Sequence, residues 1–228
     1  MFLFFLACGY DYVAQDVATE YLDSTDLVEV HQMDDWLYFE PRSDQLDIGF
    51  VFYPGGKVET EAYAPILHLL ASEGIPAYAV HVPGGIAFWK PNAAKPILES
   101  EESKQWILGG HSLGGVVAAQ FIDKHYEEYD IVGLSLWASY PSNARDLSER
   151  KELKVTSIVG DNDGVLNWEN YDASADLLPE TTKWISIAGG NHSQFGDYGF
   201  QEGDNEAGIS AEEQWSQTVD SIRQMITQ

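Results

Sequence analysis

The sequence has little cysteine and little positive charge. Its 228 residues include one cysteine, Cys8, and only 12 lysines and arginines against 37 aspartates and glutamates. A single cysteine excludes an intramolecular disulfide. The formal net charge of −25 repels phosphate backbones and anionic lipid, so we expect no nucleic-acid partner and attribute the acidity to solubility.

The sequence also has no hydrophobic run long enough for a transmembrane span, which takes about 20 residues. The apolar stretch at residues 2–7 is too short and lacks the basic start of a complete secretory signal. Residues 6–9 read LACG, which resembles the end of a bacterial lipoprotein signal with Cys8 as the lipidated residue. Two interpretations stay open: a lipid anchor at Cys8 on a cell-surface protein, or a short apolar tail on a cytoplasmic one.

The overall composition is typical of a globular domain. Hydrophobic residues make up 44% of the chain and aromatic residues 13%, which argues against disorder. A chain of this length can enclose one sizeable core. No repeat, linker or low-complexity segment divides it, so we expect an N-terminal stub over residues 1–11 and a single domain over residues 12–228. The sequence does not indicate an oligomeric state.

Segments typical of strands and helices alternate along the chain. After a short helix at 12–23 and a hairpin of strands, an apolar run at 47–53 is typical of a strand buried on both faces. The remaining predicted strands are 28–33, 36–40, 77–82, 105–108, 131–138, 153–159 and 183–188. The remaining predicted helices are 62–72, 93–99, 113–124, 168–178 and 211–226. This alternation predicts an α/β fold with a mostly parallel central sheet and helices on both faces.

No insertion between these segments is long enough for a large cap domain. The candidate lids are two loops, residues 83–92 and 195–210.

One predicted strand leads into a turn of small residues. Residues 110–114 read GHSLG, the spacing of a nucleophile elbow, in which a serine lies on a strained turn between a strand and a helix. Its glycines allow strand and helix to close tightly around a serine with an unfavourable backbone conformation. Because a predicted strand precedes the turn and a predicted helix follows it, we predict that Ser112 is a nucleophile.

A serine nucleophile needs a general base that a third group orients. In chains with such an elbow the order is serine, acid, histidine. His192 follows the last predicted strand and precedes the last predicted helix, so it is the candidate base. The five other histidines are expected in structural or surface positions: His31, His68, His81, His111 and His125.

The acid is expected after the strand at 153–159, where residues 160–164 read GDNDG. Asp163 is the first candidate and Asp161 the second. We expect one of them to be the acid and the other to accept hydrogen bonds from the backbone of the turn. Two carboxylates with no further ligand spacing are a weak metal site, so we expect no metal and no cofactor.

An oxyanion hole requires two backbone N–H groups that face the developing negative charge. One is the N–H of Leu113, the residue after the nucleophile. The other is expected in the loop that follows the strand at 47–53, where residues 54–57 read PGGK. Gly56 is the first candidate in that loop and Lys57 the second.

With these residues in place, the chain from residue 47 onward resembles the α/β-hydrolase superfamily, and within it a small bacterial esterase-like branch without a cap. The segments that carry the resemblance are YPGGKV at 53–58, GGHSLGG at 109–115, ASYP at 138–141, GDNDGV at 160–165 and GGNHSQFGDYG at 189–199. The resemblance implies the α/β-hydrolase fold and the following roles: Ser112 as nucleophile, Asp163 as acid, His192 as base, and Leu113 with Gly56 as oxyanion hole.

The expected activity is hydrolysis of a small-molecule carboxylic ester through an acyl-enzyme. Short to medium acyl chains are favoured because no cap or apolar lid is visible. The same triad would serve a thioesterase, an amidase or a dienelactone-type hydrolase, although relatives of the last kind usually have cysteine where Ser112 stands. A non-catalytic binding protein is the alternative from another class, and the complete set of triad candidates argues against it.

Overall fold

The computed structural model describes residues 9–100 and 104–227. Most of the predicted N-terminal stub, including Cys8, lies outside these residues. Within them, every helix is too short or too polar to cross a bilayer.

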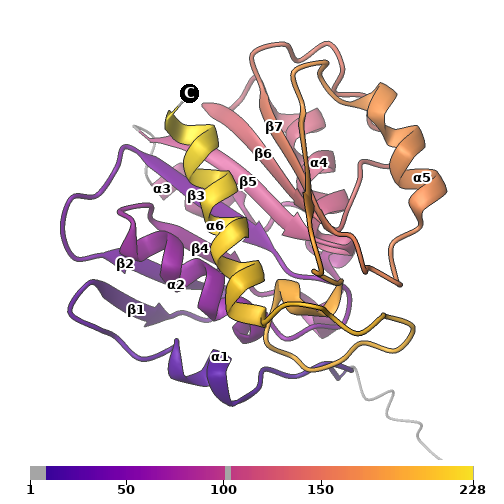
Figure 1. Cartoon of the computed structure of the whole chain (residues 1–228). Coiled ribbons are helices and arrows are strands. Elements are labelled where there is room, and N and C mark those ends of the chain that lie inside the picture. The colour runs from indigo at the N-terminus through magenta and orange to yellow at the C-terminus, as the bar shows by residue number, and fades with distance from the viewer. Residues whose placement is uncertain (1–8, 101–103, 228) are drawn as a thin grey trace, which may run out of the picture.

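A single sheet of eight strands forms the centre of the described chain (Figure 1). The strands are β1 (Val28–Gln32), β2 (Trp36–Pro41), β3 (Ile48–Tyr53), β4 (Ala77–Val80), β5 (Gln105–His111), β6 (Ile131–Trp137), β7 (Lys154–Gly160) and β8 (Lys183–Ile187). Their order is β1-β2-β4-β3-β5-β6-β7-β8. The strand β2 is antiparallel to β1 and β4, and the other neighbouring pairs are parallel. The mostly parallel sheet predicted from the alternation is confirmed.

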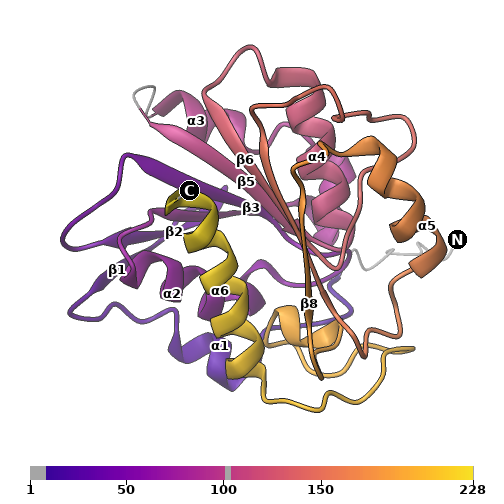
Figure 2. The same ribbon diagram turned by 45° about the horizontal axis from the view of Figure 1, so that its top comes forward.

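Helices cover both faces of this sheet. The α-helices are α1 (Asp16–Glu20), α2 (Ala64–Ser72), α3 (Lys95–Ser100), α4 (Leu113–His125), α5 (Trp168–Ala173) and α6 (Ala211–Thr227). Short 3₁₀ helices are η1 (Thr60–Tyr63), η2 (Pro83–Gly85), η3 (Ala87–Trp89), η4 (Ser174–Leu177) and η5 (Ser193–Phe195). In Figures 1 and 2, α2 and α6 lie in front of the sheet and α4 lies behind it.

The strand β3 shows why the sheet needs helices on both sides. Its residues Phe50 and Phe52 join the core under α2 and α6. The alternate residues Val51 and Tyr53 join the core under α3 and α4. Because successive side chains point to opposite faces, a strand with no polar face is stable only in the middle of a covered sheet. The continuous apolar run at 47–53 predicts this position, and β3 lies between β4 and β5.

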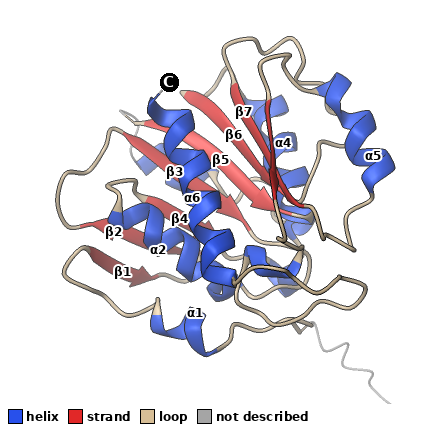
Figure 3. Ribbon diagram, in the orientation of Figure 1, coloured by secondary structure: helices blue, strands red, loops and turns tan. Residues whose placement is uncertain are grey.

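Most predicted elements differ from the observed ones by one or two residues at an end, and three differ by more (Figure 3). The predicted helix at 12–23 shortens to α1, because residues 11 and 12 instead hydrogen-bond to the carbonyl of Lys57. The strand β5 continues to His111, since β3 and β6 both pair with its glycines. The predicted helix at 168–178 is divided into α5 and η4. No large cap domain covers the sheet in the part of the chain described.

Candidate active site

The candidate residues come together at the carboxyl ends of three parallel strands. Ser112 follows β5, Asp163 follows β7, and His192 follows β8. Parallel strands place their carboxyl ends on one edge of a sheet, which is where α/β folds bind ligands. Residues that are far apart in the sequence therefore lie together at this edge: Ser112 and His192 are 80 positions apart.

Ser112 lies in a strained turn, as predicted for a nucleophile elbow. Its backbone angles are φ 51° and ψ −120°, in a region that residues with a side chain rarely occupy. Two residues at the end of β6 and just after it hold this conformation. The Ser112 N–H donates to the Trp137 carbonyl at 2.9 Å, and the Ser139 hydroxyl donates to the Ser112 carbonyl at 2.6 Å.

Close packing around the elbow explains one of its glycines. A β-carbon on Gly114 would lie 2.1 Å from the carbonyl oxygen of Tyr53. No side chain fits at that distance. The absence of a β-carbon therefore lets α4 start directly against the end of β3.

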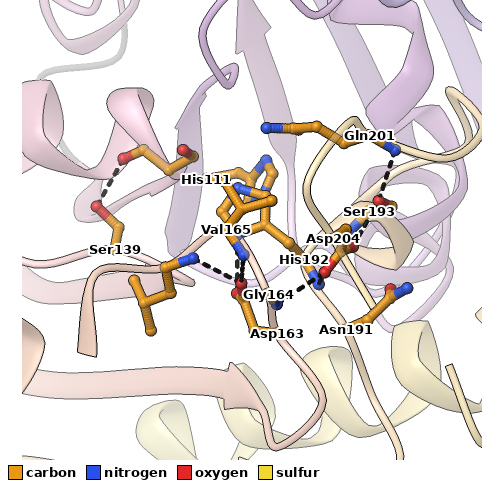
Figure 4. A network of polar contacts seen from close by, with 12 residues as sticks. His111, Ser139, Asp163, Gly164, Val165, Asn191, His192, Ser193, Gln201 and Asp204 are labelled. Carbon is orange, nitrogen blue, oxygen red and sulfur yellow. Dashed lines mark hydrogen bonds and ion pairs between the residues drawn. The ribbon is translucent and has the colours of Figure 1, made fainter. Parts of the chain in front are cut away.

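Asp163 and His192 form a buried hydrogen-bonded pair. The His192 Nδ1 lies 2.8 Å from the Asp163 Oδ2, and the residues are 1% and 3% exposed. The second carboxylate oxygen accepts the N–H groups of Val165 at 2.8 Å and Leu166 at 2.7 Å (Figure 4). An ionised carboxylate only accepts hydrogen bonds, so Nδ1 carries the proton of the neutral ring.

The opposite ring nitrogen of His192 is therefore an acceptor. This Nε2 atom is buried and has no hydrogen-bond partner among the described residues. His192 and Ser112 line the same cavity of about 260 Å³. The other lining residues are mostly apolar or small: Leu113, Val116, Ala138, Ser139, Tyr140, Val165, Leu166 and Asn167. The histidine with the acceptor nitrogen and the strained serine therefore line one cavity.

The loop after β3 offers one available N–H beside the elbow. The Lys57 N–H donates to the carbonyl of Gly85 at 2.7 Å, so it is already occupied. The Gly56 N–H has no acceptor within residues 9–100 and 104–227, and a β-carbon on Gly56 would lie 3.3 Å from the Leu113 side chain. Leu113 is the first residue of α4, where an N–H has no intrahelical acceptor. Of the two candidates in this loop, Gly56 is the one with a free donor.

The second aspartate of the turn contacts a different group. Asp161 is exposed, and its Oδ1 accepts the Gly189 N–H at 2.6 Å. It thus links the loop after β7 to the loop after β8 without reaching the His192 ring.

The remaining histidines lie elsewhere, with one exception. His31 pairs with Glu40 at 2.8 Å, and His125 pairs with Glu128 at 3.0 Å. His68 is buried in α2, and His81 follows β4. The exception is His111, whose ring centroid lies 4.4 Å from that of His192.

His111 belongs to a buried polar chain that sequence reasoning did not identify. The Tyr63 hydroxyl accepts the Gly55 N–H at 2.9 Å and lies 2.9 Å from the His111 Nδ1. Burial, and next the nearby His192 ring, lower the pKa of His111 well below its usual value. His111 is therefore neutral at neutral pH, and its Nδ1 shares a hydrogen bond with the hydroxyl of Tyr63. The chain connects the loop of Gly56 with the ring of His192, and no sequence motif marks Tyr63.

Two larger cavities and one group of possible metal ligands lie away from the candidate residues. Cavities of about 300 and 520 Å³ adjoin Lys154 and Met225 and contain none of the candidate residues. In the described chain, three metal-ligand atoms come within 4.8 Å of one another at Glu29, His31 and Glu40. These side chains lie on β1 and β2 and already pair, since Arg42 contacts Glu29 at 3.1 Å.

Comparison with known proteins identifies the fold and the family. The family model described as "Alpha/beta hydrolase family" matches residues 49–216. No curated protein sequence matches the chain. Many solved structures do, including a putative hydrolase from Agrobacterium vitis S4 with a TM-score of 0.62 and 16% identity, over 87% of this chain and 99% of that one.

Two further solved structures are also similar to this chain. Est1E from Butyrivibrio proteoclasticus has a TM-score of 0.61 and 11% identity, over 88% of this chain and 99% of its own. The thermophilic esterase Est2 from Thermogutta terrifontis has a TM-score of 0.56 and 16% identity, over 89% of this chain and 93% of its own. At such identities the likeness shows the fold alone.

Proposed function

The chain belongs to the alpha/beta hydrolase family, and from its candidate site we propose that it is a serine hydrolase that cleaves carboxylic esters. One observation carries the proposal. Among the described residues the buried Asp163–His192 pair leaves the His192 Nε2 without a hydrogen-bond partner, and His192 lines the same cavity as Ser112. An aligned acid and base beside a serine on a strained turn is the arrangement that nucleophilic acyl transfer requires.

The first half of the reaction forms an acyl-enzyme. His192 Nε2 takes the Ser112 proton, and the serine oxygen bonds to the ester carbonyl carbon. The N–H groups of Leu113 and Gly56 stabilise the negative charge on the carbonyl oxygen. The tetrahedral intermediate then collapses, the bond to the alcohol oxygen breaks, and His192 donates its proton to the leaving alcohol.

The second half releases the acid. Water gives a proton to His192 Nε2 and attacks the acyl carbon, and the same two N–H groups hold the second tetrahedral intermediate. Its collapse breaks the bond to Ser112, which takes back the proton. Asp163 stays ionised throughout and stabilises the transient imidazolium.

The cavity favours small acyl groups. Its volume of about 260 Å³ is below the range of roughly 300–1,000 Å³ common for drug-sized ligands. Val116, Ala138 and Leu166 give it an apolar wall. We therefore propose acetyl to butyryl esters as the best substrates, with rates that fall for octanoyl esters.

The test is hydrolysis of p-nitrophenyl acetate, butyrate and octanoate by the wild type and by Ser112→Ala. We expect the variant to lose roughly 10⁴- to 10⁶-fold in kcat, because the nucleophile is gone. Ser216→Ala is the matched control, since Ser216 lies exposed on α6. Equal rates in wild type and Ser112→Ala would overturn the proposal.

The same groups would also cleave a thioester or an amide, and the fold is compatible with a binding protein. A panel of acyl thioesters and anilides, run beside the esters, separates the first two. Labelling of Ser112 by a fluorophosphonate probe separates catalysis from binding, since only an activated serine reacts.

A further inference from the structure

Asp204 is a buried carboxylate outside the proposed triad. It lies in the loop between η5 and α6 and is 8% exposed. Within the described chain, no lysine, arginine or histidine forms an ion pair with it. A buried charge without a cation needs several hydrogen-bond donors to offset its lost hydration.

Those donors come from the backbone on both sides. Oδ1 accepts the N–H of Gly164 at 3.0 Å and of Asn205 at 2.9 Å, with the His192 N–H at 3.4 Å. Oδ2 accepts the N–H of Ser193 at 2.7 Å and its hydroxyl at 2.6 Å. Burial raises the pKa of Asp204, but the Gly164 and Ser193 donors outweigh it and hold the pKa below its usual value.

Two of these donors are neighbours in the sequence of the proposed acid and base. Gly164 directly follows Asp163, and Ser193 directly follows His192. One carboxylate therefore connects the loop after β7 with the loop after β8, each at the residue next to a member of the acid–base pair. Figure 4 shows Asp204 between Gly164 and Ser193, with Asp163 and His192 beside them.

We propose that Asp204 is a positioning residue that holds Asp163 and His192 at hydrogen-bonding distance. The inference rests on the proposed function, in which these two residues are the acid and the base. A carboxylate suits the task because all of its lone pairs accept. An asparagine would place an NH₂ group against the N–H of Gly164 or of Ser193, so it loses at least one bond and gains a donor–donor contact.

The loop that supplies Asp204 is itself anchored to the site. The Ser193 hydroxyl, which donates to Asp204, accepts the N–H of Gln201 at 2.9 Å. The Asn191 amide donates to the carbonyl of Asn205 at 2.8 Å. These hydrogen bonds join loop 195–210, one of the two lid candidates, to the loop of His192. The middle of loop 195–210 therefore packs against the proposed site and stabilises it.

The experiment compares wild type, Asp204→Asn and Asp197→Asn. Asp197 lies on the same loop, and its carboxylate also accepts a backbone N–H, but from Ala18 at 2.7 Å, so it is the matched control. The first readout is the downfield proton resonance of a hydrogen-bonded imidazole N–H, assigned to His192 by its loss in Asp163→Asn. The second is the rate of fluorophosphonate labelling of Ser112.

In Asp204→Asn we expect the resonance to disappear and labelling to slow roughly ten- to hundredfold, because misplacement by about 1 Å costs that much. Asp197→Asn should keep both the resonance and the wild-type rate of labelling. An Asp204→Asn protein that is folded by circular dichroism, keeps the resonance and labels at the wild-type rate overturns the inference.

Two further outcomes are distinguishable. If Asp204→Asn does not fold, Ser193→Ala removes one donor to Oδ2 without a donor–donor contact. It should broaden the resonance and slow labelling, and an unchanged Ser193→Ala would overturn the inference. If the wild type never labels but the resonance still depends on Asp204, the proposed function fails and the positioning role stands.

Discussion

Single residues in this protein are distinguished by which of their atoms already have partners. The Lys57 N–H donates to Gly85, whereas the Gly56 N–H has no acceptor among the residues that the structure describes. Two adjacent amides with the same chemistry therefore differ in whether they can bind a substrate oxygen. Among the described residues, the Nε2 atoms of His111 and His192 are both buried without a hydrogen-bond partner. Of these two rings, His192 is the one whose other nitrogen contacts a carboxylate. Residue type alone does not separate the members of either pair.

The buried tyrosines offer a test at this scale. In Tyr63→Phe the N–H of Gly55 and the Nδ1 of His111 lose their partner. We expect the free energy of unfolding in urea to fall by about 1–3 kcal/mol, the cost of an unsatisfied buried group. We also expect ester hydrolysis to slow roughly tenfold or more, because Gly55 precedes the proposed oxyanion donor Gly56.

Tyr53→Phe is the control for this prediction. The Tyr53 hydroxyl donates to the Pro91 carbonyl at 2.9 Å and accepts the Ala94 N–H at 3.1 Å, and neither partner lines the cavity of Ser112 and His192. It should lose similar stability and keep its rate. Equal loss of rate in both variants would mean that Tyr63 acts only through stability.

At the level of elements, the site depends on how closely α4 approaches β3. Gly114→Ala would push a methyl group against the carbonyls of Tyr53 and Pro54, at 2.1 and 2.5 Å. Those atoms are backbone in a buried strand end and cannot yield cheaply. We expect a loss of about 3 kcal/mol or more in urea unfolding, at the upper end of overpacking costs, together with a large loss of hydrolysis.

Gly208→Ala is the matched substitution. Its β-carbon would have no neighbour nearer than 3.4 Å, an ordinary contact. We expect stability within about 0.5 kcal/mol of wild type and an unchanged rate. A Gly114→Ala protein as stable as Gly208→Ala would contradict the close packing described for the elbow.

At the scale of the whole molecule, the main electrostatic feature is the net charge of −25. The ion pairs of the described residues are mostly exposed, and such pairs contribute little to stability. The excess of carboxylates therefore repels itself in the folded state more strongly than in the expanded unfolded chain.

We accordingly expect salt to stabilise the protein. Raising NaCl from 0.01 to 0.15 M shortens the screening length from about 30 to about 8 Å, so the melting temperature at pH 7 should rise, measured by circular dichroism. KCl at the same ionic strength should have the same effect if screening is the cause. A melting temperature that does not depend on NaCl in this range would show that repulsion is negligible.

Much of the fold follows from local sequence. The alternation of apolar runs and helical patterns sets the order of strands and helices, because these patterns depend on residues a few positions apart. The position of β3 in the buried centre of the sheet can be predicted in the same way, because this strand has no polar face. The strain at Ser112 also follows from a five-residue pattern, whose glycines act within one turn.

Contacts across the sheet edge are different, because they join residues far apart in the chain. Asp161 and Asp163 stand in the same turn, and only the way that the loops after β7 and β8 meet puts one of them against His192. Tyr63 reaches His111 across 48 positions. Asp204 reaches Gly164 across 40.

The sequence by itself determined the α/β architecture, the position of the elbow and a short set of candidate residues. Only the tertiary structure decided which candidates touch and which polar groups hold them. The physical reason is that a hydrogen bond requires two atoms within about 3 Å, and loop geometry set by distant strands decides that distance.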